Sequence, residues 1–356
     1  MLAVAGAAAM AITAVAALAP GGPAARAASI SRPAITVADG NSVIAMQTSG
    51  NGLRFYWNEH GTNTWHGEQV AANGTTFSAP SIAQDGNSVV IAAQGANNSL
   101  DFYWQPNGGS GWNMETVAVG LTTYFVPSIM QDGTSVIIAV EGPGNSLDFY
   151  WAVNGTSTWH QETVAGRGTT FSVPSMTVNG NSVNIAADGP GNSLDFYWAV
   201  NGSSTWHPEV VAGAGTTTSA PAITVNDGSV NVVALNGNGL GTEFYWALNG
   251  TTTWHPEALP GFDVSAPAIT TYPGGVHVVA TTLFGAVGDE TAANGTGTWQ
   301  WTAVSGNEAA ASFPAVTMND GIENIADVGS DGNLYFYWEY SAGQYVQELV
   351  DTSANL

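Results

Sequence analysis

The sequence predicts an all-β protein, a seven-bladed β-propeller with four antiparallel strands in each blade and a 47-residue repeat. Residues 142–155 recur letter for letter as residues 189–202, 47 positions later. A Phe-Tyr-Trp triplet also recurs, beginning at Phe55, Phe102, Phe149, Phe196, Phe244 and Phe336. A third marker is a proline at intervals of 46 or 47, at Pro33, Pro80, Pro127, Pro174, Pro221, Pro267 and Pro314. Periods of this length are typical of propellers, solenoids or arrays.

Seven repeats follow from these markers. The gap between the last two triplets is about double, so an eroded copy is expected near Asp289-Glu290-Thr291. The repeats open at Ser31 and end with residues 345–350, so each end of the array is expected to lie in its own blade. The predicted blades are 31–77, 78–124, 125–171, 172–218, 219–264, 265–311 and 312–356.

Residues 172–213 show how one repeat is read. Four short runs, at 172–178, 181–187, 193–200 and 205–211, are rich in β-branched and aromatic residues and bounded by Gly, Asn or Asp, as strands are. Asn201-Gly202 is a preferred pair for a tight hairpin turn. No helical period is present, the first two runs suit inner strands, and the charged fourth run suits the rim.

Residues 1–27 have the features of a signal peptide. Leu2 to Ala19 are apolar, Pro20-Gly21-Gly22-Pro23 breaks the run, and Ala25-Arg26-Ala27 has the form of a cleavage site. The alternative is a membrane anchor, because the run is close to the lower limit for a span. Cleavage leaves residues 28–356, with room for seven repeats and no second domain, and predicts a secreted, extracellular protein without a membrane span.

The amino-acid composition limits the kinds of binding partner that the protein can have. With 27 acidic against four basic residues the formal net charge is −23, which disfavours nucleic acid and anionic membranes. The chain has no cysteine, so a secreted form must be stabilised by its core rather than by disulfides.

Three phrases carry a family resemblance: Ser78-Ala79-Pro80-Ser81-Ile82, Asn98-Ser99-Leu100-Asp101-Phe102-Tyr103-Trp104, and Trp206-His207-Pro208-Glu209. They resemble the repeat of secreted bacterial seven-bladed propeller lectins of the PLL type and, more loosely, tachylectin- and tectonin-like propellers. The resemblance covers residues 28–356 in repeat number, length and strand order. It implies a lectin whose partners are glycans or glycoconjugates, with fucose, galactose or methylated sugars bound in repeated pockets and no metal or other cofactor. It assigns no individual binding residue.

The third and fourth strands of a blade suggest a local sugar site. With an even loop, one hairpin face carries Asp148, Tyr150, Trp159 and Gln161. The other face carries Phe149, Trp151, His160 and Glu162, and an odd loop would exchange the partners. An aromatic platform beside a carboxylate suits a sugar, which stacks its C–H face and hydrogen-bonds its hydroxyls. The predicted ligand-binding residues are Asp101, Tyr103, Trp112, Asp148, Tyr150, Trp159, Asp195, Tyr197, Trp206, Glu243, Tyr245 and Trp254.

The other blades depart from this set, and a structural interpretation stands beside it. Blade one has Arg54 in place of the acid, blade six lacks the set, and blade seven substitutes tyrosines, including Tyr345. Repeated aromatics also join blades together, and a buried Tyr needs a polar partner, so the acid can be purely structural.

A histidine follows the outer tryptophan in four repeats, with a glutamate two positions on: His66, His160, His207 and His255 with Glu68, Glu162, Glu209 and Glu257. Residues i and i+2 of a strand share a face, so a His–Glu hydrogen bond is expected, with a metal pair as the alternative.

Catalytic patterns are weak. The sequence has no cysteine nucleophile, no Gly-x-Ser-x-Gly elbow and no phosphate loop, so no catalytic residue is assigned. Near-identical pockets favour multivalent binding over one active site. The second hypothesis is a glycoside hydrolase or lyase at the channel mouth, where His277 and Asp289-Glu290 break the symmetry. The third is a structural or protein-binding adhesion module.

Overall fold

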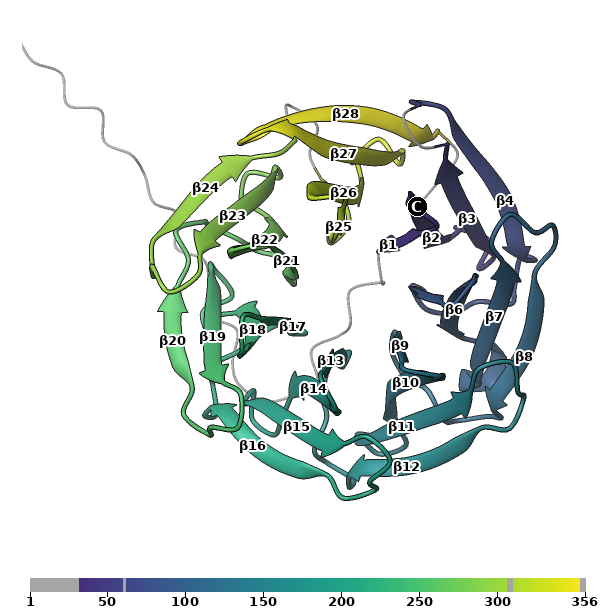
Figure 1. The fold of residues 1–356 in the computed structure, drawn as a ribbon, viewed down its shortest axis with the longest axis horizontal. Coiled ribbons are helices and arrows are strands. Elements are labelled where there is room, and N and C mark those ends of the chain that lie inside the picture. Colours follow the sequence, from purple (N-terminus) through teal and green to yellow (C-terminus); the bar gives the residue numbers. More distant parts are fainter. Residues whose placement is uncertain (1–31, 60–61, 306–309, 353–356) are drawn as a thin grey trace, which may run out of the picture.

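The computed structural model describes residues 32–59, 62–305 and 310–352. Within these ranges 28 strands form seven four-stranded antiparallel sheets, each from consecutive strands, arranged as a ring (Figure 1). The predicted seven-bladed propeller is confirmed. The predicted signal peptide, residues 1–27, lies outside the described residues. Over the same ranges the only helix is the short η1 (Ala96–Asn98), and no helix is long and apolar enough to cross a bilayer.

The strands of each blade run from the axis to the rim in chain order (Figure 1). The innermost strands are β1 (Ala34–Ala38), β5 (Ser81–Asp85), β9 (Ser128–Asp132), β13 (Ser175–Asn179), β17 (Ala222–Asn226), β21 (Ala268–Tyr272) and β25 (Ala315–Asn319). The second strands are β2 (Asn41–Gln47), β6 (Ser88–Gln94), β10 (Ser135–Gly142), β14 (Ser182–Asp188), β18 (Ser229–Leu235), β22 (Gly275–Thr281) and β26 (Ile322–Val328). The third strands are β3 (Leu53–Asn58), β7 (Leu100–Pro106), β11 (Ser146–Val153), β15 (Leu194–Val200), β19 (Thr242–Leu248), β23 (Val287–Ala293) and β27 (Leu334–Ser341). The outermost strands are β4 (Trp65–Ala71), β8 (Asn113–Ala118), β12 (His160–Ala165), β16 (His207–Ala212), β20 (His255–Ala258), β24 (Trp299–Ala303) and β28 (Gln344–Asp351).

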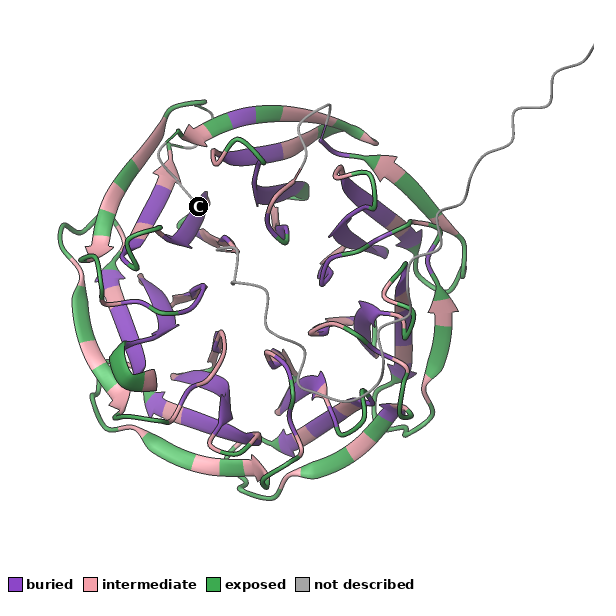
Figure 2. Cartoon of the chain, turned by 180° about the vertical axis from the view of Figure 1, so that it is seen from behind, coloured by how far each residue is buried: buried purple, intermediate pink, exposed green. Residues whose placement is uncertain are grey.

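Burial follows the position of a strand in its blade (Figure 2). The second strand is covered on both faces by the neighbouring blades, and along β10 every residue after Ser135 is buried. The outermost strand is half-solvated, and β12 has no fully buried residue. The runs predicted to be inner strands and the charged run predicted for the rim take those places.

The hydrophobic core lies between blades. At the junction of blades three and four, Ile137 and Phe149 from one blade pack with Val183 and Tyr197 from the next. The phenylalanine of the triplet therefore faces the following blade, and the tyrosine faces the preceding one. Full burial of such a side chain contributes about 1.5–3 kcal/mol, so each blade depends on both neighbours.

The hairpin register is the one expected for an even loop. Tyr150 pairs with Gln161 and Trp151 with His160 across β11 and β12, so the two predicted faces are confirmed.

The ring closes between blades seven and one. The indole of Trp65 donates to Glu348 Oε2 at 2.9 Å and packs edge-on against Phe336, with ring centroids 4.9 Å apart. Nearer the axis, Ser42 Oγ donates to Asn324 Oδ1 at 2.6 Å. Both terminal blades are complete in themselves within the described chain, so no blade is shared between the two ends.

Candidate functional site

Four cavities lie between consecutive blades, from the second blade to the sixth. Their volumes are about 250, 340, 510 and 500 Å³ at junctions two–three, three–four, four–five and five–six. In each pair, the blade that comes first in the chain contributes the phenylalanine and tryptophan of its triplet and the glutamate of its outermost strand. The next blade contributes its outer tryptophan and the hairpin turn between its third and fourth strands.

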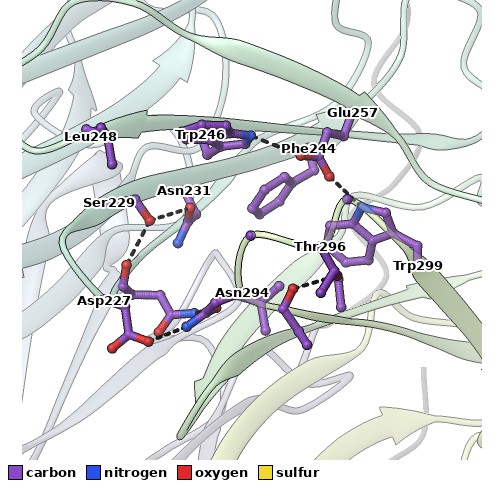
Figure 3. A pocket seen from close by; sticks show the side chains of 16 residues that line it. Asp227, Ser229, Asn231, Phe244, Trp246, Leu248, Glu257, Asn294, Thr296 and Trp299 are labelled. Atoms are coloured by element: carbon purple, nitrogen blue, oxygen red, sulfur yellow. Dashed lines mark hydrogen bonds between the residues drawn. The ribbon is translucent and has the colours of Figure 1, made fainter.

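The cavity between blades five and six shows this arrangement directly (Figure 3). Phe244, Trp246 and Glu257 line one part of it, and Trp299 of the next blade packs edge-on against Phe244, with ring centroids 5.0 Å apart. Asn294, in the hairpin turn of blade six, donates to the Asp227 carboxylate of blade five at the other end. Aromatic rings from two blades thus border a concave space that also offers carboxylate and amide groups.

The glutamate joins the indoles of two blades. Glu257 accepts hydrogen bonds from Trp246 at 3.0 Å and from Trp299 at 2.9 Å. We term this Trp–Glu–Trp contact the indole bridge. Within the described residues an outer tryptophan bonds a glutamate of the preceding blade at six junctions: Trp65–Glu348, Trp112–Glu68, Trp159–Glu115, Trp206–Glu162, Trp254–Glu209 and Trp299–Glu257. The repeated glutamate therefore has a structural bond.

The expected His–Glu hydrogen bond is wrong. The histidine instead stacks on the tryptophan of its own triplet, as His160 does on Trp151 with centroids 4.1 Å apart and planes at 19°. The same stacking occurs in the pairs Trp57–His66, Trp198–His207 and Trp246–His255. Glu162 shares a face with His160, but its oxygens accept from Trp151 at 3.3 Å and Trp206 at 3.2 Å. The indole N–H groups are the more deeply placed donors and capture the carboxylate.

The residue on the second strand divides the cavities into two kinds. Asn184 and Asn231 line the cavities at junctions four–five and five–six, and both are buried. Val90 and Ile137 take the same place at junctions two–three and three–four. The two cavities with asparagine are the larger ones and carry an amide where the others are apolar.

The predicted ligand-binding residues meet in part, because each outer tryptophan packs in one hydrophobic cluster with the tyrosine of its own set, in the pairs Trp112–Tyr103, Trp159–Tyr150, Trp206–Tyr197 and Trp254–Tyr245. Trp159, Trp206 and Trp254 line cavities, and Trp112 packs on Phe55 of blade one with centroids 5.2 Å apart. The acids and tyrosines of the same blades line none of the four cavities within the described residues; they are Asp101, Tyr103, Asp148, Tyr150, Asp195, Tyr197, Glu243 and Tyr245. At the cavities Trp159, Trp206 and Trp254 also meet residues of the preceding blade, and a role of the predicted sets in binding stays a prediction.

The three aspartates have local partners. Asp148 accepts from Ser146 and Thr163, each at 3.1 Å. Burial raises the pKa of Asp148, and these two hydrogen bonds oppose the rise. Burial, reinforced by the charge of Asp148, raises the pKa of Tyr150 to about 12. Such a phenol stays neutral at ordinary pH, as a structural tyrosine does.

The phenylalanine, triplet tryptophan and glutamate that line the cavities are not among the ligand-binding residues predicted from the sequence. They are Phe102, Trp104 and Glu115, Phe149, Trp151 and Glu162, Phe196, Trp198 and Glu209, and Phe244, Trp246 and Glu257. The signal was present, because the register already placed them on one face and the glutamate recurs in most repeats.

The residues that break the symmetry in blade six are not at the channel mouth. His277 and Asp289 are buried beside Glu323 of blade seven, whereas Glu290 accepts from the Gly261 amide of the loop that follows blade five. The axial cavity is lined by prolines, isoleucines, valines, small residues and Arg32, with no carboxylate among its described lining residues.

Comparisons with known proteins agree with this fold. No family model matches the chain, and no curated protein matches it. A solved structure of the BP39L lectin from Burkholderia pseudomallei is similar, with a TM-score of 0.80, 16% identity, and 90% of this chain and 99% of that chain covered. A lectin of Aleuria aurantia, described as a six-bladed propeller with a fucose recognition mode, has a TM-score of 0.55 and 14% identity over 79% of this chain and 96% of that one. A prolyl endopeptidase structure matches at a TM-score of 0.59 and 13% identity over 88% of this chain and 49% of its own. The chain therefore has the propeller fold of these proteins, and the resemblance to bacterial propeller lectins extends from sequence phrases to three-dimensional structure.

Proposed function

We propose that the protein is a secreted lectin that binds sugar residues in the cavities between blades, without a metal ion in those cavities. The observation that carries the proposal is the repetition, at four junctions, of a concave space bordered by aromatic rings from two blades and by a carboxylate. Repetition suits multivalent binding, because several weak sites on one particle give avidity.

The chemistry of the cavity suits a pyranose. Its C–H face can lie on an indole or phenyl ring, and its hydroxyls need acceptors and donors nearby. In the cavity of Figure 3, Trp246, Trp299 and Phe244 supply the rings, and Asn231 offers an amide. The Glu257 carboxylate accepts two indole bonds and keeps lone pairs for a ligand. Volumes of about 250–510 Å³ accommodate one or two sugar rings.

A glycan array probed with residues 28–356, followed by hapten inhibition and calorimetry, tests the proposal. The decisive variant is the double substitution Asn184→Val with Asn231→Val, which installs the type of side chain that blades two and three already carry, Val90 and Ile137. It leaves every indole bridge in place. We expect the affinity of the larger cavities to fall about tenfold, as for one lost hydrogen bond of about 1.4 kcal/mol.

The matched control is Asn113→Val, on the exposed edge of blade two, where blade seven carries Val346. It is expected to bind like the native chain. Equal affinity of the double variant and the native chain would remove the two larger cavities from the binding site. Turnover of a glycoside without retention would favour the hydrolase or lyase instead, and protein binding that free sugars do not inhibit would favour the adhesion module.

Secretion is a separate part of the proposal, supported by the apolar segment Leu2 to Ala19 and the site Ala25-Arg26-Ala27. Mass spectrometry of protein from the culture medium is expected to show Ala28 as the first residue. Protein that stays with the membrane fraction and keeps residues 1–27 would show the anchor instead.

A further inference from the structure

The junction between blades six and seven lacks the indole bridge and carries ionisable groups in its place. Strand register aligns the residues of this junction with those of the junction between blades five and six. Six positions differ, and each residue of the five–six junction is given first, followed by its counterpart at the six–seven junction: Phe244 and Asp289, Trp246 and Thr291, Glu257 and Thr302, Asn231 and His277, Val276 and Glu323, Trp299 and Tyr345. Six changes at one junction replace an aromatic surface with a polar, acidic one.

Three of these groups converge on one point. His277 Nδ1 lies 3.2 Å from both carboxylate oxygens of Asp289 and 3.4 Å from Glu323 Oε1. One ligand atom from each residue can be chosen so that all lie within 4.8 Å of one another. In a tetrahedral zinc site with bonds of about 2.0–2.1 Å, neighbouring ligand atoms are about 3.3 Å apart. The two separations from the imidazole match that edge.

The three groups are withdrawn from water and not fully satisfied by each other. Asp289 is 2% exposed and Glu323 is 0% exposed. Glu323 Oε1 has no hydrogen-bond partner among the described residues, although it points at the imidazole. The Tyr345 hydroxyl touches both Asp289 Oδ2, at 2.8 Å, and Glu323 Oε2, but it has a single proton to donate.

The negative charge buried at this junction favours the binding of a cation. Two carboxylates and one imidazole share a buried space, and the carboxylate of Glu339 adds to the negative potential at His277. Buried carboxylates are costly unless they are paired or coordinate a metal. A divalent ion would neutralise both carboxylates and would use the orphan oxygen of Glu323.

We propose that His277, Asp289 and Glu323 form a binding site for a divalent transition metal ion such as Zn²⁺, which joins blade six to blade seven in place of an indole bridge. One imidazole nitrogen and two carboxylate oxygens are zinc ligands, and the Tyr345 hydroxyl lies beside the fourth position. The role is structural, because the three side chains are buried, belong to two adjacent blades, and line none of the four cavities proposed for sugar. It differs from the sequence expectation of a chain without metal.

The test is zinc binding by the full chain after dialysis against a chelator, with one arm refolded from urea in the presence of Zn²⁺ so that burial does not block entry. We expect one tightly bound zinc per chain. The melting temperature should rise by about 5 °C at a hundredfold excess of zinc over its dissociation constant. A Co²⁺-loaded sample is expected to show visible absorption of a four-coordinate site.

Two variants test the ligands without disturbing the fold. Glu323→Val installs the valine that five of the six other blades carry, and His277→Asn installs the residue of blades four and five. Each is expected to lose at least tenfold in zinc affinity and the thermal shift, whereas the control His160→Gln, on the exposed edge of blade three, keeps both. Sugar binding is expected to be unchanged in all three.

Zinc stabilisation of Glu323→Val equal to that of the native chain would overturn the proposal. So would a refolded native chain that holds no zinc. Because the sugar assay is separate, either result leaves the proposed lectin function unaffected.

Discussion

At the scale of single residues, the molecule depends on groups that touch two blades at once. Glu162 is one of these, since each of its oxygens accepts an indole N–H, one from its own blade and one from the next. The net contribution of an ordinary hydrogen bond is about 1 kcal/mol, but a buried donor left unpaired costs about 1–3 kcal/mol. The junctions are therefore more sensitive to loss of the carboxylate than to loss of a surface contact.

Replacing Glu162 by Gln should destabilise the protein by about 1–3 kcal/mol, because the amide presents an NH₂ group to one of the two indoles. Urea unfolding followed by tryptophan fluorescence measures this. Glu59→Gln is the control, since that side chain is 72% exposed, and is expected to change stability by less than about 0.5 kcal/mol. Equal midpoints for the two variants would show that the indole bridge contributes no net stability.

Two glycines of blades three and four serve different purposes. Gly202, in the turn after β15, has φ +78°, and a side chain at this position would meet no atom within 4 Å, so only its backbone conformation requires glycine. Gly142 has no positive φ, but a Cβ there would collide with Asp148 Oδ2. The close approach explains the buried aspartate of these blades, which fills the space that the glycine leaves.

Substituting alanine at each of these glycines is expected to separate the effect of backbone conformation from the effect of the steric clash. Gly202→Ala should cost about 1 kcal/mol from the left-handed conformation alone. Gly142→Ala should cost more, about 1–3 kcal/mol, because Asp148 must move away from Ser146 and Thr163. In Gly142→Ala combined with Asp148→Ala the steric part should disappear. If the double variant loses as much stability as the two single variants together, a clash between residue 142 and Asp148 is not the cause.

At the scale of strands and blades, the sequence predicts what is local. The 47-residue period, the four runs per repeat and the Asn-Gly turns determine the sheets, and an even loop determines which side chains share a face. What the sequence does not show is which neighbour each face meets. The sequence predicts that Trp159 lies with Tyr150 of its own hairpin, which the packing bears out, but it does not predict that the ring also brings Trp159 against Glu115 of the preceding blade.

The same reasoning explains the error over histidine. Register placed His160 and Glu162 on one face, which is correct, but a shared face does not decide between two competing donors. The indole of Trp206 arrives from blade four, 44 positions along the chain, and no local pattern indicates that contact. Contacts between blades join residues that are far apart in the sequence, so the repeat period alone does not predict which side chains meet.

At the scale of the whole molecule, acidity and closure act together. Because Trp65 and Glu348 close the ring, every blade packs between two neighbouring blades. All seven junctions must therefore form in a chain whose net charge is −23. Some carboxyls are buried with no cation beside them. Asp327 is 1% exposed, and burial raises its pKa to about 7, although the hydroxyl of Ser312 donates to it at 2.7 Å.

This carboxyl should make the protein more stable in mild acid than at neutral pH. Its pKa in the folded chain lies above the ordinary value of 3.8, so the folded state binds the proton more tightly than the unfolded state. The stabilisation is complete below about pH 4 and is lost as the pH rises through about 7, at up to about 1.4 kcal/mol per pH unit. Asp188 acts in the same direction, because burial and the charge of Asp195 raise its pKa to about 7.

Calorimetric melting temperatures between pH 4 and 8 measure the effect, and salt separates it from general repulsion. Self-repulsion of a highly acidic surface also grows with pH, but 0.5 M NaCl screens exposed charges and leaves a buried carboxyl almost untouched. We expect the melting temperature to fall from pH 5 to pH 8 even in high salt, and the slope to be smaller in Asp327→Asn, which cannot ionise. A slope that vanishes in salt, or that is the same in Asp327→Asn, would assign the pH dependence to the surface and not to the junctions between blades.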